Sequence, residues 1–89
     1  MLYITWDSIK NATLKEERGV CFDDVVAALH DGRLLEFIKH PCLGREHQYL
    51  MLVEIAGYVY VIPFVEDEEK WFLKTMFPSR KYTKQHLGK

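Results

Sequence analysis

Apolar residues follow a helical period in the first third of the chain. Four of them are spaced i, i+3, i+4 and i+7, as on one face of a helix: Phe22, Val25, Val26 and Leu29. Asp23 and Asp24 lie in the first turn of this predicted helix, where the helix dipole favours negative charge, and Gly32 ends it.

A helix is also predicted ahead of this stripe. Asp7 is a good N-cap, no Gly or Pro interrupts Ser8–Arg18, and Gly19 suits the left-handed residue that ends a helix. The apolar side chains of this helix are few, so we expect it to lie on the surface, held by Trp6, Ile9, Ala12 and Leu14.

Beyond Gly32 the pattern changes to that of β-strands. Predicted strands cover residues 34–39, 49–56, 58–65 and 71–77, and a short one precedes the first helix at 2–5. The second and third of these form a hairpin around Gly57, and their two apolar faces predict a central place in the sheet. Pro63 cannot donate to a neighbouring strand, so its position requires a bulge or an edge.

After the last strand, Ser79 is a candidate N-cap for a short helix over residues 80–86. The element order is therefore β-α-α-β-β-β-β-α within a single domain, residues 1–89. Short connections favour antiparallel pairing. We predict an α+β fold in which the N-terminal helices pack on an antiparallel sheet.

Composition supports a folded domain, since 48% of residues are apolar and 13% are aromatic. No apolar run approaches the roughly 20 residues of a membrane span, and no basic segment followed by an apolar one marks a signal peptide. The two cysteines, Cys21 and Cys42, form no disulfide framework. We therefore expect a cytoplasmic protein without a membrane association.

Charge is distributed unevenly along the chain. Residues 1–69 hold 6 basic and 13 acidic residues, a balance of −7, whereas residues 70–89 hold 6 basic residues and no acid. Lys74 lies in the last predicted strand, while Arg80 and Lys81 open the last predicted helix. Cations at a helix N-terminus are unfavourable by about 0.3–1 kcal/mol unless an anion binds there. This end of the chain is a candidate phosphate-binding site, and a solvated basic tail is the alternative.

Other residues that could take part in catalysis or metal binding have simpler structural explanations. His40, Cys42 and His47 share one loop but match no standard zinc spacing, so we expect no metal and no cofactor. Cys21 has no obvious catalytic base and is interpreted as a small buried residue. The acidic run 66–69 is interpreted as a solvated turn. Three tyrosines have the period of a core and are alternatively candidates for stacking on RNA bases: Tyr49, Tyr58 and Tyr60.

Several segments resemble the BrnT-type toxins of bacterial type II toxin–antitoxin modules, in the RelE/ParE-like superfamily. They are ITWDSIKN near the start, GVCFDDVV at the second helix, VEIAGYVYVIPFVEDEE in the hairpin and FLKTMFPSRKYTKQH at the end. The resemblance covers nearly the whole chain. It departs at Cys21, where a Ser often caps the helix, and at Glu17-Arg18-Gly19, where Lys-His-Gly is common.

The resemblance implies a RelE/ParE-like fold and a metal-independent endoribonuclease of the mRNA interferase type, which cleaves RNA to restrain growth. On this basis Lys74, Arg80 and His40 are the candidate catalytic residues, while Lys81, Lys84 and Tyr82 are candidates for binding RNA. The expected reaction is attack of a 2′-hydroxyl on the adjacent phosphate. An extended chain would separate Lys74 from Arg80 by about 20 Å, so this hypothesis requires the turn at Pro78-Ser79 to fold back.

The implied partners are RNA and a cognate DNA-binding antitoxin, through which the complex reaches operator DNA; a homodimer is left open. Two alternatives stand beside this function. One is a ParE-like inhibitor that binds a protein such as a topoisomerase and catalyses nothing. The other is a degenerate toxin that acts only as an interaction module.

Overall fold

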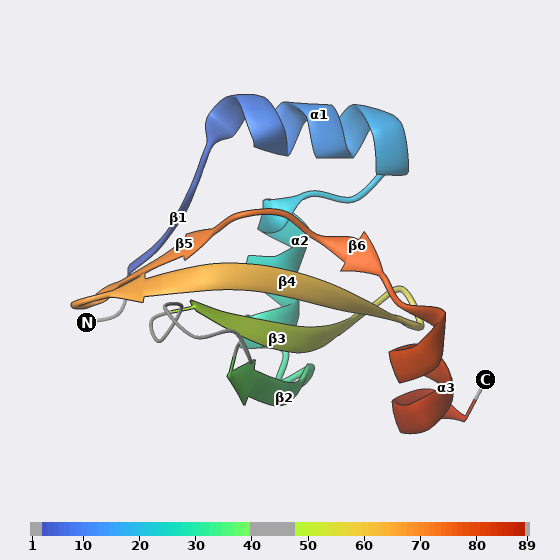
Figure 1. The fold of residues 1–89 in the computed structure, drawn as a ribbon. Helices are drawn as coiled ribbons and strands as arrows, with labels where there is room; N and C mark the ends of the chain where they lie inside the picture. Colours follow the sequence, from blue (N-terminus) through green and yellow to red (C-terminus); the bar gives the residue numbers. More distant parts are fainter. Residues whose placement is uncertain (1–2, 40–47, 89) are drawn as a thin grey trace.

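Helices lie on both faces of one sheet in the computed structural model, which describes residues 3–39 and 48–88 (Figure 1). In chain order the described elements are β1 (Tyr3–Trp6), α1 (Ser8–Arg18), α2 (Phe22–His30), β2 (Leu34–Lys39), β3 (Gln48–Ile55), β4 (Tyr58–Asp67), β5 (Lys70–Leu73), β6 (Phe77–Pro78) and α3 (Arg80–Leu87). The strands are ordered β1-β5-β4-β3-β2, and β6 also pairs with β4. The predicted α+β class is confirmed.

The β3–β4 hairpin forms the middle of the sheet, as its two apolar faces predicted. Its turn consists of Ala56 and Gly57, with φ angles of 54° and 78°, and it joins the paired residues Ile55 and Tyr58. Two consecutive residues with positive φ are typical of the tight hairpin turn that matches strand twist.

The prediction of an antiparallel sheet is correct for every described strand pair except one. β1 pairs with β5 in parallel, with Tyr3 opposite Lys70 and Trp6 opposite Leu73. Short connections impose antiparallel pairing only on strands that follow one another in the chain. β1 and β5 are separated by most of the chain, so this constraint does not apply to them.

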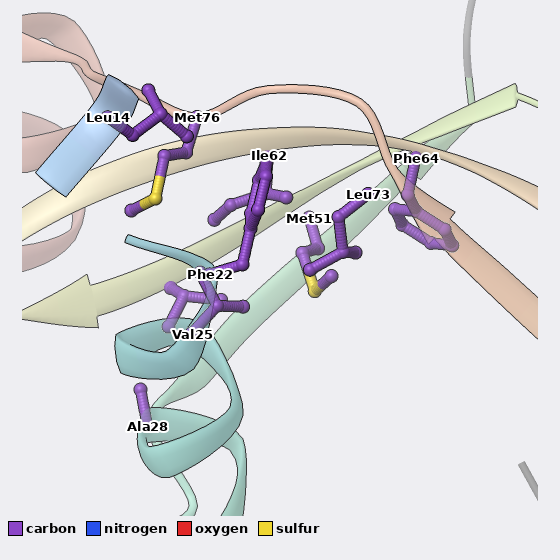
Figure 2. Packing of buried hydrophobic residues seen from close by; sticks show 10 residues of the cluster. Leu14, Phe22, Val25, Ala28, Met51, Ile62, Phe64, Leu73 and Met76 are labelled. Carbon is purple, nitrogen blue, oxygen red and sulfur yellow. The ribbon is translucent and has the colours of Figure 1, made fainter. Parts of the chain in front are cut away.

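The main core lies between α2 and one face of the sheet, which we call the α2 face (Figure 2). Phe22 and Val25 are fully buried there against Met51, Ile62 and Leu73. The sheet residues alternate with others that point to the opposite side. Burial of Phe22 alone is expected to stabilise the fold by about 3–5 kcal/mol, judged from the usual cost of truncating a core aromatic.

A smaller core lies on the opposite side, which we call the α3 face. Leu52, Val59 and Val61 are buried there, and Tyr82 and Leu87 of α3 pack against them. α3 covers only the end of the sheet that adjoins the β3–β4 turn (Figure 1). The rest of this face is not covered by a helix of the described chain.

α1 lies at the surface, as expected, but only part of the predicted contact set, Trp6 and Leu14, packs against the core. Leu14 is buried, whereas Ile9 is 78% exposed and Ala12 is exposed as well. Ile9 lies about 140° around the helix from Leu14, so the two side chains cannot face the core together. None of the described helices is long and apolar enough to cross a membrane.

The strand predicted over residues 71–77 is interrupted. Leu73 pairs with Phe64 and Phe77 pairs with Val61, so three residues stand opposite two residues of β4. Such an extra residue is a β-bulge, and it shifts the alternation of side chains by one position. Met76 is consequently buried in the main core with Leu73, although strict alternation placed it on the opposite face.

The bulge also explains how β4 accommodates Pro63. The N–H of Lys74 donates to the Pro63 carbonyl at 2.9 Å, so this carbonyl points towards the interrupted strand. In an antiparallel ladder the N–H and C=O of one residue point the same way. The N–H that Pro63 lacks would therefore point at the bulge, and the predicted need for a bulge at Pro63 is confirmed.

Candidate nucleic-acid interface

The N-terminus of α3 is held to the start of β4 by a set of short hydrogen bonds. Ser79 Oγ accepts from the Tyr82 N–H at 3.2 Å, which makes it the predicted N-cap. The Ser79 N–H donates to the Val59 carbonyl at 2.9 Å. Thr83 Oγ1 accepts from the Val59 N–H at 2.9 Å and donates to the Ser79 carbonyl at 2.6 Å. Buried Thr83 thus fixes α3 in position.

Three cations lie on the exposed side of this helix. Arg80, Lys81 and Lys84 are exposed, whereas Tyr82 is half-buried against the smaller core. The Lys81 ammonium lies 5.6 Å from the centre of the Tyr82 ring. Tyr82, predicted to contact RNA, therefore packs inwards and supports a lysine. The first turn of α3 contains no acidic residue.

Lys74 is exposed at the bulge, on the same side as the paired residue Pro63 and thus on the α3 face. Its distance from α3 follows from β4. The Lys74 N–H donates to the Pro63 carbonyl, and the Ser79 N–H donates to the Val59 carbonyl. Val59 and Pro63 are four residues apart on β4, so the backbones of Lys74 and Ser79 are about 13 Å apart. The chain runs on through β6 without folding back. The backbones of Lys74 and of the start of α3 therefore adjoin one surface, about 13 Å apart.

Exposed aromatic side chains flank Lys74. Phe72, Lys74 and Phe77 lie opposite Val65, Pro63 and Val61, so they share the α3 face and follow each other at intervals of about 7 Å. Phe72 is 41% exposed and Phe77 is 39% exposed. Beside this Phe72–Lys74–Phe77 row, Tyr3 of β1 is 52% exposed and pairs with Lys70.

The aromatic residues of this surface were missed by sequence reasoning. Tyr49 and Tyr60 pack against the main core, so their interpretation as core residues is confirmed, and Tyr58 contacts the Tyr60 ring. The alternation of side chains along the strand could have revealed Phe72. Phe72 lies one position from buried Leu73 and must point the other way. Phe77 could not be found in this manner, because the bulge resets the alternation.

The cations of this region have no anionic partners within the described residues. None of Lys70, Lys74, Arg80, Lys81 and Lys84 forms an ion pair there, and the one ion pair found joins His86 Nε2 to Glu36 Oε1 at 3.5 Å. That distance is long for a hydrogen bond, and His86 Nε2 is buried without one. Solvated cations are suited to binding phosphates, and the exposed aromatic rings beside them are suited to stacking on unstacked bases.

Two further predicted sites have different outcomes. The candidate catalytic residue His40 and the loop residues Cys42 and His47 lie outside the described residues. Cys21 is described and buried, and burial raises the pKa of its thiol above the ordinary 9.0. Its nearest side-chain partner is Asp23 Oδ2, at 3.6 Å from the sulfur. The thiol stays protonated at neutral pH, as expected for a buried structural cysteine.

The motif Trp6-Asp7…Lys10-Asn11 has a structural explanation. The Trp6 ring contacts Phe22 at 5.6 Å, and Asp7 Oδ1 accepts from the N–H groups of Ile9 and Lys10. Asn11 Oδ1 accepts from the Phe22 N–H at 2.7 Å. Asn11 therefore caps α2 from α1. Its role was not predicted, because the two residues are eleven positions apart and belong to different helices.

A scan of the chain against protein-family models gave no match, and a search of curated proteins gave none.

Proposed function

We propose that the chain binds single-stranded RNA across the α3 face and cleaves it as the toxin of a type II toxin–antitoxin module. The observation that supports this most is the Phe72–Lys74–Phe77 row, which leads through β6 to the cations of α3. Base stacking on an aromatic side chain is worth about 1–3 kcal/mol per base and tolerates any sequence. The motif resemblance supplies the toxin identity and the RelE/ParE-like fold in this proposal.

The separation of the cations determines how RNA would lie on this surface. Lys74 would bind a phosphate of the RNA segment whose bases stack on Phe72 and Phe77. Arg80 and Lys81 would bind a different phosphate of the same strand, because their backbone is about 13 Å or more from that of Lys74. The hypothesis that Lys74 and Arg80 share one phosphate stays a prediction, because two extended long side chains can span such a backbone distance.

The proposed reaction needs no metal. The 2′-oxygen loses its proton to a base and bonds to the adjacent phosphorus, and the bond from phosphorus to the leaving 5′-oxygen breaks as that oxygen gains a proton. The products are a 2′,3′-cyclic phosphate and a 5′-hydroxyl. Lys74 would stabilise the charge that develops on the phosphate. His40 remains the proposed base or acid.

The test combines growth with RNA analysis. The chain is induced alone, as wild type and as the Lys74→Ala and Arg80→Ala variants, and total RNA is examined at arrest. We expect arrest with fragmented RNA in the wild type and loss of both effects in the variants. Purified protein should cleave an RNA oligonucleotide in EDTA and leave its 2′-deoxy counterpart intact.

Two results would contradict the proposal. Growth arrest with intact RNA and altered DNA supercoiling would support the ParE-like inhibitor. Folded protein that binds RNA without arrest or cleavage would support a degenerate toxin. Lys39→Ala is the matched control for Lys74→Ala, because Lys39 is an exposed strand lysine on the α2 face, opposite Tyr49.

A further inference from the structure

A groove lies on the α2 face, on the side of the sheet opposite the proposed RNA surface. It consists of two adjoining hollows of 410 and 190 Å³, and Phe37 and Trp71 line both. We call it the α2-face groove. Its larger part lies between α2 and the sheet, where the wall is formed by the apolar side chains of Ile4, Val26, Leu29 and Leu34.

The floor of the groove is an aromatic cluster with fixed geometry. The Trp71 ring lies 4.6 Å from Phe64 and 5.4 Å from Phe37, and Tyr49 stacks on Phe64 at 5.6 Å. Trp71 Nε1 donates to Glu66 Oε2 at 3.3 Å, which orients the indole. Phe37 is nevertheless 47% exposed. A preformed apolar surface of this kind needs little rearrangement to accept an apolar side chain.

Charge distinguishes between the possible occupants. Glu66 lines the smaller hollow and also a third hollow of 420 Å³, formed with Val65, Asp67 and Glu68. At Glu66 the groove thus meets the exposed acidic run 66–69. The other titratable side chains that line it are His30 at the α2 end and Tyr49 in the smaller hollow, and Lys39 pairs opposite Tyr49 on the same face. An RNA phosphate would be repelled at the acidic end, whereas lysine or arginine would be attracted.

We propose that the α2-face groove binds a segment of a protein partner in which an apolar anchor side chain is followed by lysine or arginine. The anchor inserts beside Phe37 and Trp71, and the cation reaches the carboxylates of the 66–69 turn. This inference does not depend on RNA cleavage. Because the groove and the Phe72–Lys74–Phe77 row lie on opposite faces of the sheet, RNA and the partner segment bind at the same time.

The experiment selects binders from a displayed random-peptide library against the purified chain, then removes those that also bind the Phe37→Ser variant. The remaining peptides should share an aromatic or branched aliphatic residue close to a lysine or arginine. A labelled peptide with this consensus should lose at least about tenfold in affinity with Phe37→Ser, as expected for an anchor contact. Glu66→Gln removes a charge at nearly constant size. It should also lower the affinity for the peptide, and it should not make that affinity more sensitive to salt.

Phe72→Ser is the matched control, since Phe72 has similar exposure on the opposite face, and it should leave peptide affinity unchanged. The proposal is overturned if no Phe37-dependent peptide survives, if the survivors are acidic, or if NMR shift changes map to the α3 face. It is also overturned if the chain forms a dimer that Phe37→Ser dissociates, because the groove would then be occupied by a second copy.

Discussion

Phe72 is the single residue on which the proposed RNA surface can best be tested. Replacement with alanine removes one stacking platform while leaving the core intact, so affinity for a labelled single-stranded RNA should fall by about 1–3 kcal/mol, or about 5- to 150-fold. Fluorescence anisotropy measures this loss. Phe37→Ala should leave RNA affinity unchanged, since Phe37 has a similar exposure but lies on the other face. Equal losses in both variants would refute an RNA site on the α3 face.

The buried thiol of Cys21 should make the stability of the fold depend on pH. Because burial raises the pKa of its thiol in the folded state above 9.0, the thiolate is less favoured in the folded chain than in the unfolded one. Its stabilising contribution is present below pH 9 and is lost as pH rises through the folded-state pKa. Denaturant unfolding at pH 8 and pH 10 should therefore show a smaller loss of stability in Cys21→Ala than in the wild type. An identical pH dependence would contradict this account.

At the scale of single residues, the sequence predicted burial correctly where the residue type and its apolar neighbours favour it. It did not predict which face of the sheet a side chain occupies beyond the β-bulge. Cys21 and the core tyrosines were interpreted correctly because small or aromatic residues between apolar neighbours are usually buried. Strict alternation along the predicted strand 71–77 would place Met76 and Phe77 on the wrong faces. The extra residue beside Pro63 shifts both, and a proline indicates that a bulge is needed without indicating on which strand it forms.

Among the elements, α2 depends on a contact that comes from another helix. Asn11→Ala removes the acceptor of the Phe22 N–H and should destabilise the chain by about 0.5–2 kcal/mol, the usual value of an N-cap. Chemical denaturation measures the difference. Lys10→Ala, an exposed neighbour on α1, is the control and should change stability by less than about 0.5 kcal/mol. Growth arrest by a folded Asn11→Ala protein would show that this motif residue is structural and not catalytic.

The helices and the central hairpin were predictable because their signals are local. Asp7, Gly19 and Ser79 cap helices within a few residues of their own positions, and Gly57 forms a tight turn between adjacent strands. The parallel β1–β5 pair and the Asn11 cap depend on contacts between distant parts of the chain. No local propensity encodes such contacts, so they could not be derived from one sequence.

Over the whole molecule, Lys74 and the cations of α3 lie away from the acidic 66–69 turn, whereas Lys70 pairs opposite Asp67 in the β4–β5 hairpin. The acidic 66–69 turn adjoins the groove, while the unpaired cations lie on the α3 face and on α3. RNA affinity should therefore fall steeply with salt. Each phosphate contact contributes about 0.7 to the slope of log affinity against log salt for a single strand.

This slope provides the test at the scale of the whole molecule. Lys74→Ala should reduce its magnitude by about 0.7, and the double variant Arg80→Ala/Lys81→Ala should reduce it by more. Lys39→Ala should leave the slope unchanged. A slope near zero in the wild type would mean that the C-terminal cations are a solvated tail, and the proposed RNA surface would then be wrong.

The parallel pairing of β1 with β5 has a consequence for biosynthesis. A nascent chain ending before residue 70 has already made β1, both N-terminal helices and the central hairpin, yet β1 still lacks the strand it pairs with. The same late segment, residues 70–87, carries Phe72, Lys74, Phe77 and the whole of α3. The surface proposed to hold RNA is thus synthesised after the rest of the sheet, so under this proposal RNA binding begins only once residues 70–87 have left the ribosome.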